Sequence, residues 1–99
     1  MKDKLLKIIN HYGVMKQLKY IHTEYFELDE AIIDCKKDEY ERFDYDKATH
    51  VAEEIADVMV MLKQFQYYYS IEDEDIGEIM KFKIDRQLER ISKEQMENL

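Results

Sequence analysis

The sequence predicts an all-α protein that folds as a four-helix-bundle-like subunit. The chain of 99 residues contains no proline and only two glycines, and most of its other residues favour helices. Along much of the chain, apolar residues recur at alternating spacings of three and four, as they do in amphipathic helices. Short connections separate four such segments, which is typical of a bundle. We therefore expect one domain over residues 1–99, with helices at residues 3–12, 14–38, 48–70 and 73–95.

The first two predicted helices meet at Gly13. Residues 3–12 form a short amphipathic segment, and the glycine is expected to end it. Residues 14–38 carry a stripe of apolar residues spaced alternately by four and three: Val14, Leu18, Ile21, Tyr25, Leu28, Ile32 and Cys35. Residues 39–47 lose this period and are expected to connect the second helix to the third.

The third predicted helix, residues 48–70, has a stripe of the same kind. Its members are Val51, Ile55, Val58, Leu62, Phe65 and Tyr69. Thr49 is the expected N-terminal cap of this helix. Before the fourth helix, Ser70 and Asp73 have the spacing of a capping box. The fourth helix is amphipathic as well, and it ends in a polar tail.

Composition excludes several classes of partner. The net charge is −8, which opposes binding to nucleic-acid polymers and to anionic membranes. No apolar run approaches the length of a membrane span. The single Cys35 cannot form an internal disulfide and fits a reducing compartment. We expect a cytoplasmic protein.

Two pairs of acidic residues occupy equivalent positions on the second and third helices. Glu24 and Glu27 each directly precede a stripe residue, and so do Glu54 and Asp57. Each pair therefore lies on the flank of an apolar stripe, where a carboxylate is costly unless it is compensated. If the two helices pack antiparallel, the four carboxylates meet at one level. Oxygen ligands of this kind suit Mg²⁺, with Mn²⁺ as a substitute, and no histidine or cysteine points to zinc.

These acids, read in sequence order, resemble the signature of the MazG-like family of all-α nucleoside triphosphate pyrophosphatases. The segments TEYFELDEAI and EEIADVMVML carry the likeness, although Thr23 stands where the family has the first of two glutamates. The resemblance implies that Glu24, Glu27, Glu54 and Asp57 bind Mg²⁺. It also implies an α-helical homo-oligomer that cleaves nucleoside triphosphates between the α and β phosphates, releasing a monophosphate and pyrophosphate.

Within that reading, Glu24 and Glu27 are both candidates for the catalytic base, and the sequence does not choose between them. A triphosphate also needs cations. Lys83, Arg86 and Arg90 share one face of the fourth helix and are the candidate phosphate-binding residues, with surface pairing as their alternative role. Base and sugar specificity, and the number of metal ions, stay open.

Two other classes of protein compete with the pyrophosphatase. A carboxylate-bridged di-iron bundle would need Glu-x-x-His motifs, and no histidine of this chain has a glutamate three residues before it. A non-catalytic acidic helical interaction module, with its acids only solvated, is the main alternative. Some apolar residues lie outside the stripes: Met15, Phe26, Met59, Met61 and Tyr68. We expect them to form a seam between copies of the chain, in a homodimer or a tetramer built from dimers.

Overall fold

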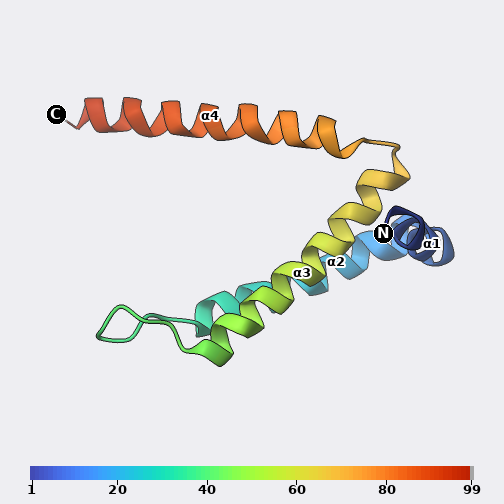
Figure 1. Ribbon diagram of the computed structural model, residues 1–99, viewed down its shortest axis with the longest axis horizontal. Coiled ribbons are helices and arrows are strands. Elements are labelled where there is room, and N and C mark those ends of the chain that lie inside the picture. The colour runs from blue at the N-terminus through green and yellow to red at the C-terminus, as the bar shows by residue number, and fades with distance from the viewer. Residues whose placement is uncertain (99) are drawn as a thin grey trace. The chain divides into compact units, whose positions relative to one another are not determined.

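The structure, a computed structural model, describes residues 1–98 (Figure 1). It contains four helices: α1 (Lys2–Tyr12), α2 (Val14–Asp34), α3 (Tyr45–Tyr68) and α4 (Asp73–Glu97). No strand occurs in the described part of the chain, so the predicted all-α, four-helix-bundle-like class is confirmed. The chain divides into two compact units, Met1–Tyr69 and the segment that begins at Ser70. The single-domain expectation stays a prediction.

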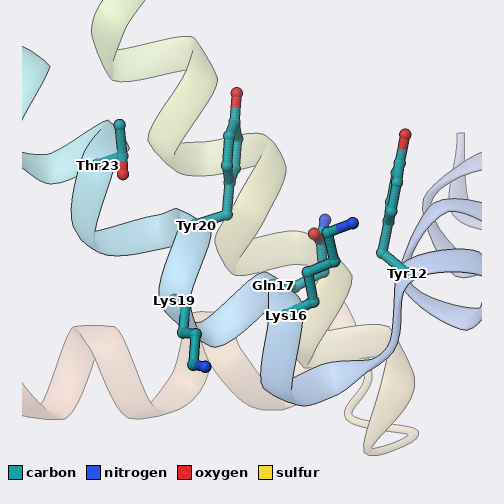
Figure 2. Close-up of a pocket in the computed structure, with 6 residues that line it drawn as sticks. All are labelled: Tyr12, Lys16, Gln17, Lys19, Tyr20 and Thr23. Atoms are coloured by element: carbon teal, nitrogen blue, oxygen red, sulfur yellow. The ribbon is translucent and has the colours of Figure 1, made fainter.

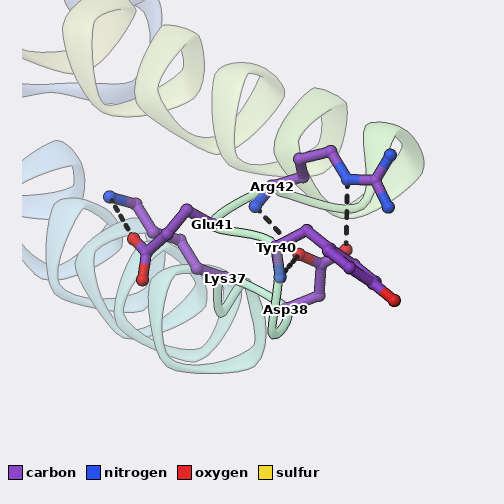
Figure 3. Close-up of polar contacts among 5 residues, drawn as sticks. All are labelled: Lys37, Asp38, Tyr40, Glu41 and Arg42. Atoms are coloured by element: carbon purple, nitrogen blue, oxygen red, sulfur yellow. Dashed lines mark hydrogen bonds and ion pairs between the residues drawn. The ribbon is translucent and has the colours of Figure 1, made fainter.

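The α2 helix ends four residues earlier than predicted, at Asp34 rather than residue 38. The amide of Cys35 donates to the carbonyls of Ala31 and Ile32, which closes the last turn. Beyond it the backbone finds other partners, because the Asp38 carboxylate accepts from two amides of the following turn, at 2.8 and 2.9 Å (Figure 3). Short acidic side chains compete with helical hydrogen bonds in this way.

The connection between α2 and α3 is an ordered turn rather than a loose link. Lys37 and Phe43 form an isolated antiparallel bridge, and Glu41 has a positive φ of 62°. Ion pairs join Lys37 to Glu41 at 3.3 Å and Arg42 to Asp38 at 3.6 Å (Figure 3). These bonds hold the turn that reverses the chain.

The α3 helix begins at Tyr45, three residues before the predicted start, because Asp44 caps it. The Asp44 carboxylate accepts a hydrogen bond of 3.0 Å from the amide of Lys47, which satisfies one of the free donors of the first turn. The expected cap, Thr49, lies inside the helix and donates its hydroxyl to the carbonyl of Tyr45. The prediction that Thr49 caps the helix was wrong, because the carboxylate of Asp44 accepts the hydrogen bond from the first turn five residues earlier.

Within the first unit, α2 and α3 pack antiparallel, and α1 packs against both (Figure 1). Gln17 Nε2 donates to Gln64 Oε1 at 2.8 Å near one end of the pair. Lys47 and Asp34 form an ion pair of 3.6 Å near the other end. Along α2 and along α3 the two contacts are separated by the same number of residues. The antiparallel pairing of the two helices therefore keeps one register over this length.

The buried face of the α2–α3 pair is offset from the predicted stripes by one residue. On α2 the buried residues are Gln17, Ile21, Glu24 and Ala31, and on α3 they include Glu54, Val58, Met61 and Gln64. Most of these directly precede a stripe residue. Several stripe residues are correspondingly exposed: Leu18, Tyr25, Ile32, Ile55, Leu62 and Tyr69. The helices are therefore rotated so that Glu24 and Glu54 lie within the seam, while Glu27 and Asp57 are not buried.

The α4 helix has no buried residue. Its N-terminal cap is Glu72, two residues after the Ser70 of the predicted capping box, and the Glu72 side chain makes no capping hydrogen bond. Three acids in the first turn instead favour the helix start through their interaction with its dipole. Among residues 1–98, none of the helices combines the length and apolar character needed to cross a bilayer.

Candidate metal centre

Four carboxylates converge between α2 and α3. Glu24 and Glu27 come from α2, while Glu54 and Asp57 come from α3. One oxygen atom from each lies within 4.8 Å of one from every other. The three-residue spacing puts each pair on one side of its helix, and the antiparallel register then brings the pairs to one level. The sequence predicted this convergence.

Two of these acids are buried, and each is left with an unpartnered oxygen. Glu24 is only 6% exposed and Glu54 only 8%. The Oε2 atom of each is shielded from solvent and has no hydrogen-bond partner within residues 1–98. A buried polar atom without a partner is costly, so these oxygens point to a cation or a proton that the protein chain itself does not provide.

The electrostatics of the cluster favour the same conclusion. Burial raises the pKa of Glu54, and the charges of Glu27 and Asp57 raise it further. His50 opposes this shift, with its Nε2 atom 3.8 Å from Glu54 Oε1. A bound cation would reverse the balance and favour the ionised carboxylate.

Tyr20 lies on α2 one turn before Glu24 and interacts with its carboxylate. Its pKa is raised first by a hydrogen bond to the Glu24 side chain, then by the charge of that carboxylate. The phenol is thus held protonated as a donor to one of the acids. A donor at this position orients Glu24, as groups around a metal ligand commonly do.

The donor set fits a hard divalent cation. Octahedral Mg²⁺ places opposite oxygens about 4.2 Å apart, and Ca²⁺ places them about 4.6–5.2 Å apart. The observed spread of up to 4.8 Å is wider than the value for Mg²⁺ and falls inside the range for Ca²⁺. Small side-chain movements would close the four oxygens on Mg²⁺.

The candidate phosphate-binding residues belong to the second unit. Lys83, Arg86 and Arg90 lie on α4, at spacings that put them on one side of that helix. Their role in binding phosphate stays a prediction.

Sequence reasoning missed the polar residues of the buried seam. Gln64 is 1% exposed and accepts from Gln17, and its own Nε2 atom lies 3.6 Å from the sulfur of Met61. The sequence did carry a signal for them: Gln17 directly precedes Leu18 and Gln64 directly precedes Phe65, the same offset from the apolar stripes that the four acids have.

Sequence reasoning also missed a cavity of about 530 Å³ that residues of α1 and α2 line together (Figure 2). Its walls are Tyr12, Lys16, Gln17, Lys19, Tyr20 and Thr23.

Comparison of the chain with protein-family models, with curated proteins and with solved structures finds no match. The likeness of its acidic motif to the MazG-like family therefore stays a prediction, and the function proposed below rests on the geometry of the site.

Proposed function

We propose that this chain is a Mg²⁺-dependent nucleoside triphosphate pyrophosphohydrolase of the MazG-like type. It would cleave the substrate between the α and β phosphates and release a nucleoside monophosphate and pyrophosphate. The observation that carries this proposal is the pair of buried, unpartnered oxygens of Glu24 and Glu54 inside a four-carboxylate cluster. A merely solvated acidic surface would not leave such oxygens.

The roles of the acids follow from their positions. Glu24, Glu27, Glu54 and Asp57 would hold the cation, with Asp57 at the exposed edge of the cluster. Bound Mg²⁺ supplies polarisation of phosphoryl oxygens and a lower pKa for a bound water. Glu24 or Glu27 would accept the proton of the water that attacks phosphorus. The bond to the pyrophosphate oxygen then breaks, and pyrophosphate leaves with the electron pair.

The substrate brings negative charge to an acidic protein, so cationic side chains are needed. Lys83, Arg86 and Arg90 are proposed to hold the β and γ phosphates, because they offer three cations on one side of α4.

We also propose that the functional protein is a homodimer or a tetramer built from dimers. The exposed apolar side chains include four of the five expected at a seam, namely Met15, Phe26, Met59 and Tyr68. The fifth, Met61, is only 4% exposed and belongs to the core, so that assignment was wrong. An extensive apolar surface of this kind favours burial against a second copy.

The test is a panel of nucleotides incubated with Mg²⁺, with the products separated by chromatography. We expect a monophosphate and pyrophosphate from at least one nucleotide. In the Asp57→Asn variant, turnover should collapse even at saturating nucleotide, because the cation loses a charged ligand. The matched control is Glu53→Gln, which removes an acid from the same helix at a side chain that is 69% exposed.

Two outcomes would refute the proposal. Release of a diphosphate with orthophosphate would show a different bond being cleaved. No turnover of any nucleotide, with Mg²⁺ or Mn²⁺, would instead favour the non-catalytic interaction module.

A further inference from the structure

The cavity between α1 and α2 has two aromatic walls. Tyr12 is 49% exposed and Tyr20 is 52% exposed, so both rings are open to a ligand. Figure 2 shows the two rings standing on either side of Lys16 and Gln17, while Lys19 extends away from them. The ammonium group of Lys16 lies over one face of the Tyr12 ring, 5.1 Å from its centre, so a base that stacks on that face takes the place of this cation–π contact.

Tyr20 joins this cavity to the carboxylate cluster. Its ring forms one wall, and Tyr20 stands four residues before Glu24 on α2, so the two side chains lie on the same side of this helix. Thr23, which also lines the cavity, directly precedes Glu24. A molecule whose phosphate lies at the carboxylates can therefore extend along α2 into the cavity without leaving the surface of the first unit.

A second hollow beside the cluster has the opposite character. It measures about 470 Å³, and its walls include Glu27, Glu30, Asp34 and Glu54. Its one ring is the imidazole of His50, which lies 3.8 Å from the Glu54 carboxylate, and no tyrosine or phenylalanine lines it. The cavity between α1 and α2 is thus better suited to the nucleoside part of a nucleotide, because stacking on an aromatic face is available to every base.

We propose that the cavity lined by Tyr12, Lys16 and Tyr20 receives the base and sugar of the nucleotide, with the base stacked on the Tyr12 ring. This inference rests on the proposed function, since it places the rest of a substrate whose α phosphate lies at the carboxylates. Stacking is tolerant of base identity. The loss of the Tyr12 ring should therefore lower the binding affinity for purine and pyrimidine nucleotides alike.

The test measures binding rather than turnover, using calorimetric titration in the presence of Mg²⁺. One ligand is a nucleotide analogue with a non-hydrolysable methylene group between the α and β phosphates, in an adenine form and a uracil form. The other is inorganic tripolyphosphate, which has phosphates but no base. We expect Tyr12→Ala to weaken both nucleotide analogues roughly five- to a hundred-fold and to leave tripolyphosphate binding unchanged.

Two variants serve as controls. Tyr12→Phe keeps the ring and loses only the hydroxyl, so it should bind the analogues as the unmodified protein does. Tyr40→Ala removes an exposed tyrosine from the connection between α2 and α3, outside the cavity walls, and should change neither affinity. Thermal melting of each variant checks that the fold is retained.

Unchanged nucleotide affinity in Tyr12→Ala would overturn the inference while leaving the pyrophosphohydrolase intact. Equal weakening of tripolyphosphate would overturn it as well, because the cavity would then hold phosphates. If the unmodified protein binds no nucleotide and hydrolyses none, the proposed function fails, and this inference fails with it.

Discussion

Replacing Glu54 by glutamine should make the metal-free protein more stable at neutral pH. The folded-state pKa of Glu54 is raised by burial and by its acidic neighbours. A carboxyl group with a raised pKa contributes stability below its unfolded pKa, and this contribution is lost as the pH rises through the folded value. Glu54→Gln cannot ionise. The difference in melting temperature between variant and wild type should therefore grow in favour of the variant as the pH rises.

Adding metal should reverse this order. Mg²⁺ at 100 times its dissociation constant would add about 2.7 kcal/mol to the free energy of unfolding of the wild type. For a unit of this size, 1 kcal/mol corresponds to about 4–8 °C in melting temperature, so the expected rise is roughly 10–20 °C. In Glu54→Gln most of this rise should vanish, because one of two buried anionic ligands is gone.

The assay is thermal melting of both proteins with and without Mg²⁺, Mn²⁺ or Ca²⁺, each at several pH values. Glu53→Gln is the control: it makes the same chemical change one residue away, at an exposed side chain. Equal metal-induced rises in wild type, variant and control would refute the reasoning, since the acids would then be only a charged surface. A metal-free Glu54→Gln protein less stable than wild type at neutral pH would contradict the electrostatic part.

Three further predictions test other parts of the molecule. Replacing Lys83 or Arg86 by alanine should lower kcat/KM roughly ten- to a hundred-fold, measured with saturating Mg²⁺, through the loss of a charge-assisted contact to phosphate; unchanged kinetics would remove these residues from the site. Gln64→Leu should lower the free energy of unfolding, measured with urea, by about 1–3 kcal/mol, because the buried Gln17 amide loses its hydrogen-bond partner. Replacing Gln17 and Gln64 together by leucine should recover part of that loss. Analytical ultracentrifugation should show a dimer or tetramer, and a monomer alone at tens of micromolar protein would contradict the proposed oligomer.

Helix content and the meeting of the four acids were predictable from local pattern. Helical periodicity repeats over short stretches of chain, and a spacing of three residues puts two side chains on one side of any α-helix. Because Glu24 and Glu27 have the same offset from their stripe as Glu54 and Asp57 have from theirs, any antiparallel pairing of the two helices tends to gather them.

Helix ends were predicted less well, because they depend on which polar group captures the backbone. Asp38 and Asp44 each accept backbone amides near the connection, so α2 ends early and α3 starts early. Both carboxylates were visible in the sequence. Their hydrogen bonds, however, form only when the chain turns between the two helices.

The sequence by itself determined that this chain is helical and that four acids share equivalent positions on two amphipathic segments, because both properties follow from spacing along the chain. Only the tertiary structure decided which side of each stripe is buried. The rotation of α2 against α3 places Glu24 and Glu54 inside the seam, together with the hydrogen-bonded Gln17 and Gln64. Helical periodicity locates an apolar face only to within about one residue, and the packing of a second helix fixes the remaining angle.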